Sequence, residues 1–303
     1  MKSTVGQLPK ISVITPTFNQ GAFIEKTINS VLSQNYPNLE FIIIDGGSTD
    51  NTVEIIKKYE KQLTYWVSEP DRGQGHAINK GMALGTGEYL TWLNSDDWYL
   101  PNALFEINKA FNDYPEASII VGIGESVNLE GRIIYDFPPG LKIDNLTLLS
   151  WFSGTWFLQP ASVFKRSVWE KCGPLNEEEH LVFDLELWLK ASEAGFTFQP
   201  IDKTLAQALV HPDAKTTAMS WRTYVEGAIL LERFGASGKI KYEAERLLNE
   251  IENMTKSLKW YEENHSKMLS HPLVRLIRPL AKRIARDESQ YWSTSIPQWV
   301  NKK

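Results

Sequence analysis

The sequence predicts an α/β fold, a mostly parallel sheet flanked by helices, followed by a helical C-terminal extension. Through about residue 115, short apolar segments alternate with segments whose apolar residues recur at helical spacing. This alternation implies parallel strands joined by right-handed helical crossovers. Segments such as LEFIIID are apolar on both faces, which is typical of strands covered by helices on both sides. From about residue 219 onward the chain is charged and helical in pattern.

Four strand–helix units account for the first part of the chain. The predicted strands are 11–15, 39–45, 63–69 and 88–94, and the predicted helices are 22–34, 51–62, 75–84 and 102–114. Each strand runs into a polar loop, in order TPTFNQG, DGGSTDN, EPDRGQG and NSDD. Because ligands of open α/β sheets bind outside the carboxyl ends of the strands, we expect these four loops to form one binding edge.

The second part of the chain has a different pattern. We expect two strands around a turn at Glu130 and Gly131, a helix over 184–195, and two further strands in FTFQPI and LAQALV. The sequence therefore predicts one domain over residues 1–218 and a helical extension over 219–303.

Composition and charge argue against several classes of protein. The 303 residues carry a net charge of −5, which argues against a general nucleic-acid-binding surface. The single cysteine, Cys172, cannot form an intrachain disulfide, as suits a reducing compartment. The N-terminal MKSTVGQLPK lacks the apolar core of a signal peptide, and no segment approaches the roughly 18 apolar residues that span a bilayer. We therefore expect a cytoplasmic protein.

Two adjacent carboxylates, Asp96 and Asp97, follow the fourth predicted strand in LTWLNSDD. Like charges side by side repel, so a strand gains little from them, and we expect both to be loop residues at the binding edge. They either form a solvated turn or supply oxygen ligands for Mg²⁺ or Mn²⁺. Such ions take one or two carboxylates together with substrate phosphates.

The second predicted strand also ends in a carboxylate, Asp45, just before the glycine turn of DGGSTDNT. The glycines account for the turn, and Ser48 or Asp50 accounts for the cap of the next helix. Neither explains Asp45. At this position its carboxylate is well placed to accept a hydrogen bond from an N–H of a planar base bound at the sheet edge.

Two later segments carry further candidate groups. In HLVFDLELWLKA, Asp184 and Glu186 stand among apolar residues. Asp184 either caps the helix or, with its pKa raised by apolar neighbours, acts as a general base. In HPDAKTT, His211 is a candidate Mn²⁺ ligand if it reaches the same edge, and Lys215 could meet phosphate oxygens.

In this order, the segments resemble glycosyltransferase family 2, whose members have the GT-A fold. The resemblance runs from Ile11 to Thr217 through four blocks. The blocks are ITPTFNQGAFIEKTINSVLSQNYPNLEFIIIDGGSTDNT, SEPDRGQGHAINKGMALGTGEYLTWLNSDD, QPASVFKRSVWEKCG with FDLELWL, and HPDAKT. It implies a nucleotide-sugar-binding half over about 10–115 and an acceptor and catalytic half over about 116–218.

The resemblance also implies roles for individual residues. Asp184 matches the catalytic base, and the neighbouring Glu186 is a candidate supporting carboxylate that the resemblance does not assign. Asp96 and Asp97 match the metal motif, with Asp97 as the direct ligand of Mn²⁺ or Mg²⁺, and His211 matches a residue near the metal or diphosphate. The positions implied for nucleotide binding are Pro16, Thr17, Asn19, Asp45, Gly47, Asp71, Asn79 and Asp96.

Two positions depart from the family pattern. Asn94 stands where many members have aspartate, which lowers the charge around the metal. Ile78 stands where many members have arginine, before the asparagine at 79, which weakens the expectation of diphosphate contacts there. The resemblance does not extend into the helical extension beyond about residue 219.

The implied reaction is the metal-dependent transfer of a sugar, with inversion, from a UDP-linked or similar nucleotide sugar to a hydroxyl of a glycan or lipid-linked acceptor. Two other classes compete with it. A non-catalytic nucleotide-sugar-binding module on the same fold would need no base such as Asp184. A nucleotidyltransferase would carry a glycine-rich, basic triphosphate loop near its start, and TPTFNQG contains no Lys or Arg.

The C-terminal tail is basic, unlike the chain as a whole. Arg275, Arg278 and Lys282 recur at spacings of three and four, a pattern typical of an amphipathic helix on an anionic membrane surface. Pro279 interrupts the pattern, and packing against the rest of the chain or against a second copy is the alternative. The expected partners are therefore the donor, the acceptor, the inner face of a membrane and a second subunit.

Overall fold

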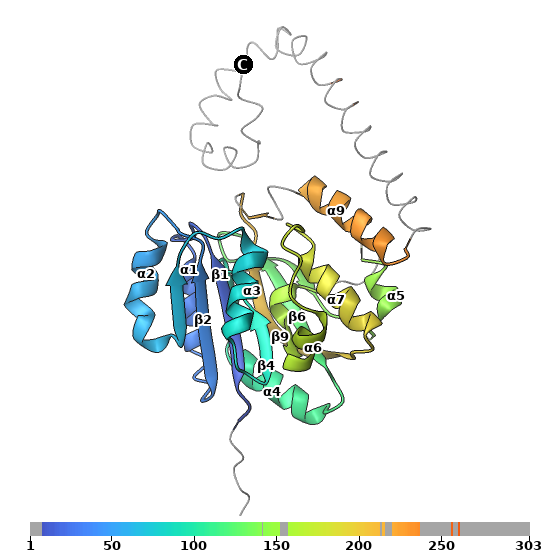
Figure 1. Ribbon diagram of the computed structural model, residues 1–303, viewed down its shortest axis with the longest axis horizontal. Coiled ribbons are helices and arrows are strands. Elements are labelled where there is room, and N and C mark those ends of the chain that lie inside the picture. Colours follow the sequence, from blue (N-terminus) through green and yellow to red (C-terminus); the bar gives the residue numbers. More distant parts are fainter. Residues whose placement is uncertain are drawn as a thin grey trace, which may run out of the picture. The chain divides into compact units, whose positions relative to one another are not determined.

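The computed structural model describes residues 8–140, 142–151, 157–212, 214–215 and 220–236, together with Lys256 and Trp260. The chain divides into two compact units, Met1–Ser237 and Gly238–Lys303, and the fold given below is that of the first. Its centre is one sheet flanked by helices (Figure 1). The basic tail, predicted as an amphipathic helix, lies outside the described residues. None of the helices in the described ranges has the length and apolar character needed to span a bilayer.

Parallel strands and helices alternate in the first half, as predicted. The strands are β1 (Ile11–Thr17), β2 (Leu39–Asp45), β3 (Tyr65–Ser68) and β4 (Tyr89–Trp92), and the helices are α1 (Ile24–Leu32), α2 (Thr52–Tyr59), the short 3₁₀ helix η1 (Glu60–Gln62) and α3 (Gln74–Leu84). β1 pairs in parallel with both β2 and β4, and β2 pairs in parallel with β3. Every residue of β1 is buried, as in a strand that is covered on both faces.

The second half extends the same sheet, mostly with antiparallel strands. Its elements are β5 (Asp97–Tyr99), α4 (Ala103–Asp113), β6 (Ile119–Val127), β7 (Ile133–Phe137), α5 (Asn145–Leu148), η2 (Gln159–Ala161), β8 (Ser162–Lys165), α6 (Arg166–Cys172), α7 (Phe183–Glu193), β9 (Phe198–Leu209) and α9 (Ser220–Arg233). The strand order is β3-β2-β1-β4-β8-β6-β9-β5, with β7 paired to β6. β8 is antiparallel to β4 and to β6. The loop after β4 therefore lies where the parallel half meets the rest of the sheet.

Two predictions about strands were wrong. FTFQPI and LAQALV form a single strand, β9, because both parts pair with β6 on either side of a register shift. Asp97 was expected in a loop but begins β5, where it lies opposite Ala208 of β9, and its side chain is buried. The pairing of β5 with β9 draws Asp97 into the protein. Asp96 lies in the turn before β5, as predicted.

Helix α3 packs directly on β1. A methyl group added at Gly81 would lie 2.4 Å from a side-chain carbon of Ile14, so the close approach requires a residue without a side chain. Because α3 is held at this distance, its first residue, Gln74, reaches the loop after β4 and donates a hydrogen bond to Asn94.

An aromatic cluster packs α7 against the sheet. The indoles of Trp92 on β4 and Trp188 on α7 are stacked, with ring centroids 6.0 Å apart, and both side chains are fully buried. Phe157 and Phe164 pack against Trp188, with centroid distances of 5.8 and 5.9 Å. Buried aromatic pairs contribute large apolar areas to a core. The cluster therefore ties α7 to β4, the strand that leads to Asp96.

Candidate active site

The loops after β1 and β2 are joined by hydrogen bonds at the edge of the sheet. The Asn19 N–H donates to Ser48 Oγ at 2.7 Å, and the Thr49 N–H donates to Asn19 Oδ1 at 2.8 Å. Asn19 adopts the left-handed backbone conformation, with φ of 52°, which asparagine tolerates better than most residues. The two loops therefore meet, as expected for a shared binding edge.

Asp45 lies at the end of β2 and is fully buried. Its Oδ2 accepts hydrogen bonds from the Gly47 N–H (3.2 Å), the Ser48 N–H (2.9 Å) and Ser68 Oγ (2.6 Å), and its Oδ1 accepts a short one from Ser48 Oγ. Gly47 has a φ of 85°, which favours glycine. Asp45 thus organises the turn, and a direct bond to a ligand would have to replace or share one of these four bonds.

The end of β1 presents a different kind of group. Pro16 and Thr17 are both buried, and Thr17 lies beside Asp45 in the pairing of β1 with β2. The Thr17 hydroxyl has no hydrogen-bond partner among the described residues. A buried hydroxyl without a partner costs free energy, roughly 1–3 kcal/mol in protein mutational data. A ligand that bonds to Thr17 would remove this cost.

Asp71 and Asn79 belong to the segment from the end of β3 into α3. Asp71 Oδ1 accepts from the Gly73 N–H at 2.7 Å, and a methyl group added at Gly46 would lie 2.6 Å from Asp71 Oδ2. Asp71 is therefore packed against the loop after β2. Asn79 instead bonds both backbone groups of Leu175, through Oδ1 at 2.9 Å and Nδ2 at 3.0 Å. Asn79 thus holds the loop before α7.

Asp96 and His211 bring the ends of β4 and β9 together. Asp96 Oδ2 lies 3.2 Å from His211 Nε2, and which atom donates depends on the histidine tautomer. His211 is 3% exposed, and its ring lies 4.5 Å from the Phe23 ring, centroid to centroid. His211 therefore meets the condition set for it as a candidate ligand, since it lies at the same edge as Asp96.

Asp97 faces the interior. Its Oδ2 accepts from Asn94 Nδ2 at 3.1 Å, and its Oδ1 accepts from the Leu209 N–H at 3.3 Å. Burial, and secondarily the neighbouring charge of Asp96, raise the pKa of Asp97 well above its ordinary value. The two adjacent carboxylates therefore have different surroundings, although the sequence placed both in one loop.

A chain of hydrogen bonds links Lys215 to Asp97. Lys215 Nζ donates to Gln74 Oε1 at 3.3 Å, Gln74 Nε2 donates to Asn94 Oδ1 at 2.7 Å, and Asn94 in turn donates to Asp97. Asn94 both accepts and donates, which an aspartate at this position could not do when ionised. Sequence reasoning missed Gln74, and its only signal was a polar residue at the start of α3, after the glycine of EPDRG.

Lys215 also lies close to the start of α7. Its Nζ is 5.9 Å from the centroid of the Phe183 ring, and burial lowers its pKa. Phe183 directly precedes Asp184. Lys215 therefore connects the loop after β4 with the helix that carries Asp184.

Asp184 is half-buried in the first turn of α7. Its Oδ1 accepts from the Leu185 N–H at 2.8 Å, and burial raises its pKa to about 6. Glu186 has a different environment, since it is buried and its Oε1 lies 3.2 Å from Lys190 Nζ. A carboxyl group with a pKa near 6 can be ionised at neutral pH and still accept a proton.

The described residues contain no group of three or more His, Cys, Asp or Glu side chains that could hold a metal ion by themselves. Asp96 and His211 nonetheless bring one carboxylate oxygen and one imidazole nitrogen, both possible metal ligands, together at the sheet edge where the loops meet. Mg²⁺ usually binds through one or two carboxylates and completes its coordination with water and substrate phosphates. The pair fits an ion that is shared with a bound phosphate.

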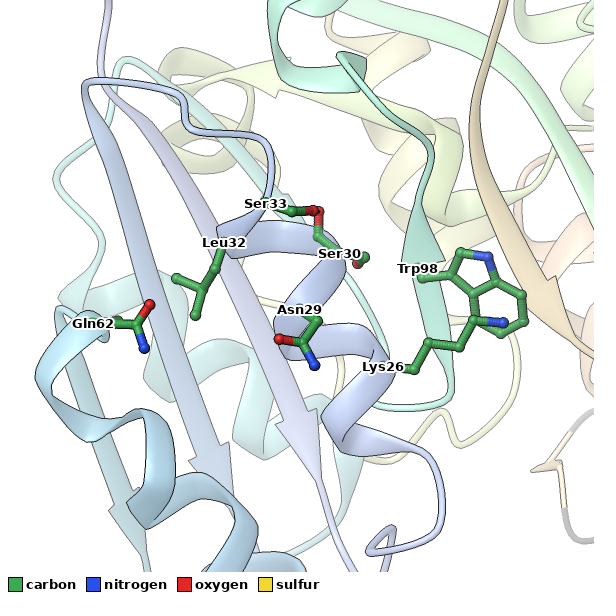
Figure 2. A pocket seen from close by; sticks show the side chains of 7 residues that line it. All are labelled: Lys26, Asn29, Ser30, Leu32, Ser33, Gln62 and Trp98. Atoms are coloured by element: carbon green, nitrogen blue, oxygen red, sulfur yellow. The ribbon is translucent and has the colours of Figure 1, made fainter.

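A hollow of about 480 Å³ lies elsewhere, along the outer side of α1 (Figure 2). Its lining residues are Lys26, Asn29, Ser30, Leu32, Ser33, Gln62 and Trp98. The Lys26 ammonium lies over the Trp98 ring, 2.9 Å from its centroid. None of the residues predicted to form the site lines this hollow. The candidate site is therefore the edge of the sheet at which the loops after the parallel strands meet.

Comparison with known proteins identifies relatives of this chain. The glycosyl transferase family 2 model matches residues 12–157. An uncharacterized glycosyltransferase of Rickettsia typhi is 31% identical over 218 residues, which cover 69% of this chain and 66% of that protein. The chain spans 66% of the length of this relative and 58% of the length of a second one from Rickettsia prowazekii.

Solved structures share the fold. Staphylococcus aureus TarS, in a fragment bound to UDP, has a TM-score of 0.54 and 21% identity, and the match covers 73% of this chain and 65% of the fragment. A mannosyltransferase from Pyrobaculum calidifontis, in complex with GDP-Man and Mn²⁺, has a TM-score of 0.57 and 17% identity, and the match covers 95% of this chain and 88% of that protein. The predicted GT-A fold is confirmed.

Proposed function

Because this chain belongs to glycosyl transferase family 2, we propose that it transfers a sugar from a nucleotide diphosphate sugar to a hydroxyl group of an acceptor. The observation that carries the proposal is the Asp96–His211 pair, 3.2 Å apart, where the parallel half of the sheet meets the rest. Ligands of open α/β sheets bind at such a change in strand order. Asp184 supplies the base that a simple nucleotide-binding module would not need.

The donor binds along the loops after β1, β2 and β3. Thr17 offers an unpartnered buried hydroxyl there, and the bonds between Asn19 and Ser48 hold the first two loops in place. We expect a UDP-linked donor, because the TarS fragment with the same fold was solved with UDP. The mannosyltransferase with the same fold was solved with GDP-Man, so GDP-mannose is the competing donor.

Asp96 and His211 are the residues that would hold a divalent metal ion. When bound, Mn²⁺ or Mg²⁺ would stabilise the negative charge of the leaving diphosphate. The family resemblance implied Asp97 as the direct ligand. We propose Asp96 instead, because Asp97 is buried and both of its oxygens already accept hydrogen bonds, from Asn94 and from the Leu209 N–H. Lys215, which donates to Gln74 and lies 5.9 Å from the Phe183 ring, would meet the phosphates.

Asp184 takes the proton from the acceptor hydroxyl as the hydroxyl oxygen attacks the anomeric carbon. The new glycosidic bond forms as the bond to the diphosphate breaks, and a single displacement inverts the configuration at that carbon. Oδ1 of Asp184 is held by the Leu185 N–H, which fixes the orientation of the carboxylate. Glu186 is paired with Lys190, so we assign it a supporting position on the helix and not the proton transfer.

The test is release of nucleoside diphosphate by the full chain from UDP-GlcNAc, UDP-glucose and GDP-mannose, with Mn²⁺ or with a chelator. We expect release from one donor, dependent on the metal and lost in Asp184→Asn. Calorimetry with the same three donors is the second measurement. Tight binding of a donor without release, with or without candidate glycan acceptors, would support a non-catalytic module instead.

A further inference from the structure

The loop between α6 and α7 leads directly to Asp184 and has no regular secondary structure of its own. Its first part is tied to the donor-binding half of the molecule. Asn79 bonds both backbone groups of Leu175, and the Arg72 guanidinium pairs with Glu177 at 2.6 Å. These contacts hold the loop at α3, ahead of the stretch that enters α7.

The last part of the same loop is held by α9. Glu226 Oε2 accepts a hydrogen bond from the Leu181 N–H at 3.2 Å, and Arg233 forms a short ion pair with Glu179. Leu181 lies three residues before Asp184. Figure 1 shows α9 next to the end of α7 at which the helix begins. The loop is therefore held between α3 on one side and α9 on the other.

Glu226 places a carboxylate just ahead of the start of α7, where it accepts from the Leu181 N–H and not from the first turn of the helix. The N-cap residue of α7, Val182, has no side chain that could accept a hydrogen bond from the first turn. Unpaired N–H groups and the helix dipole make a carboxylate favourable near a helix start. The Glu226 carboxylate, 16% exposed, lies near the start of α7 and is held in turn by Arg222 Nε at 2.9 Å. A bond from a backbone N–H to a partly buried carboxylate is stronger than one between neutral groups.

The ion pair between Arg233 and Glu179 contributes less to holding the loop than the bond from the Leu181 N–H to Glu226. The Arg233 side chain is 45% exposed, and exposed ion pairs are typically worth at most about 1 kcal/mol. α9 itself is fixed by apolar packing, since Leu230 and Leu231 are buried. This packing allows Glu226 to act as a rigid partner for the loop.

We propose that α9 is a positioning element for the catalytic base, in which Glu226 fixes the entry of the chain into α7 and thereby the direction of Asp184. α9 lies outside residues 12–157, the part that matches the family model. The inference rests on the proposed function, because it assigns Asp184 the proton transfer. Glu226 would touch neither donor nor acceptor, and its effect on the reaction would be indirect.

Three variants of the full chain separate this role from general support of the fold. Glu226→Ala removes the acceptor for the Leu181 N–H. Glu226→Gln keeps an oxygen that can accept the same bond but loses the charge. Glu232→Ala is the matched control, since Glu232 is an exposed glutamate on the same helix.

The first measurement is hydrogen exchange of the backbone amides between residues 179 and 187, which requires no substrate. We expect faster exchange in Glu226→Ala, partial recovery in Glu226→Gln, and no change in Glu232→Ala. Unchanged exchange in Glu226→Ala would overturn the proposal. Faster exchange across the whole of α9 and the sheet would also overturn it, because the effect would then be general loss of stability.

The second measurement is turnover with the donor that the wild-type chain uses. We expect Glu226→Ala to lower kcat about 5- to 30-fold, the range for losing one or two kcal/mol, with the donor KM within about twofold. Glu226→Gln should recover most of this loss, and Glu232→Ala should match the wild type. A wild-type chain that releases no nucleotide contradicts the proposed function, and the exchange data still decide the role of Glu226. An active wild type with an equally active Glu226→Ala contradicts only the positioning role.

Discussion

The end of β2 and the start of α7 each carry a carboxylate of the proposed site, Asp45 and Asp184, and the two carboxylates have different surroundings. Asp45 accepts four hydrogen bonds from Gly47, Ser48 and Ser68. Asp184 is held at Oδ1 by the N–H of the next residue, and its burial raises its pKa to about 6. The first carboxylate is therefore held by four hydrogen bonds, and the second by a single backbone bond.

This difference corresponds to two tasks. A donor-binding loop has to keep one shape, and a carboxylate that bonds several N–H and O–H groups fixes that shape. A general base has to gain and lose a proton near neutral pH, so its ionised form must be stabilised less. Asp96 and Asp97 also differ in their surroundings, because Asp96 lies at the edge with His211 and Asp97 lies in the interior.

The largest expected effect is that of Asp184→Asn. This change keeps the shape of the side chain and removes its basicity, so turnover should fall about 10²- to 10⁴-fold with unchanged UDP affinity. In the wild type the base must be ionised, and because burial raises its pKa to about 6, kcat/KM should fall as the pH drops through about 6. The measurement is the pH profile of donor turnover.

Glu193→Gln is the matched control for this test, since Glu193 is an exposed acidic residue on the same helix. It should leave both the rate and the profile unchanged. An Asp184→Asn chain that keeps near-native turnover would remove the contrast between the two carboxylates, and Glu186 or Glu179 would become the next candidate for the base.

The second effect should separate Asp96 from Asp97. Asp96→Asn should lower turnover about 10²- to 10³-fold and raise the Mn²⁺ requirement, with little change in thermal stability. Asp97→Asn should instead lower the free energy of unfolding by about 1–3 kcal/mol, because an amide would turn an N–H group toward the donor from Asn94 or Leu209. Metal titration of activity and thermal unfolding measure the two. If Asp97→Asn raised the Mn²⁺ requirement and Asp96→Asn mainly lowered the stability, Asp97 would be the metal ligand.

The third effect concerns Asp45, the carboxylate that accepts four hydrogen bonds. Asp45→Ala should weaken UDP binding by about 1–3 kcal/mol, since the turn loses the group that orders it. Ser68→Ala removes only one of the four bonds to Asp45 and should have a smaller effect in the same direction. Calorimetry with UDP measures both. Equal UDP affinity in Asp45→Ala and wild type would show that this loop does not bind the nucleotide.

The smallest effect is expected for the hydrogen-bond chain that runs from Lys215 through Gln74 and Asn94 to Asp97. Gln74→Leu breaks the link between Lys215 and Asn94 and should raise the donor KM about 3- to 10-fold, corresponding to about 0.5–1.5 kcal/mol for a hydrogen bond. Gln62→Leu, at an exposed residue of the hollow along α1, is the control. A donor KM that is the same in both variants would mean that Lys215 acts independently of Gln74.

Much of the fold and part of the site could be read from the sequence. Alternating apolar periods predicted β1 to β4 and α1 to α3, because burial on both faces of a parallel strand leaves a continuous apolar segment. Polar residues at strand ends then indicated a binding edge, and the structure brings Asp96 and His211 together there. The GT-A fold followed from the resemblance of the ordered segments to glycosyltransferase family 2.

The tertiary structure alone decided which of two adjacent carboxylates faces the interior. Side chains alternate along a strand, so assigning Asp96 and Asp97 required knowledge of how β5 pairs with β9. The bonds from Lys215 to Gln74 and from Leu181 to Glu226 join residues that are 141 and 45 positions apart in the chain. Local periodicity carries no information about such pairs, because they depend on where the packing of α3, α7 and α9 on the rest of the protein places each side chain.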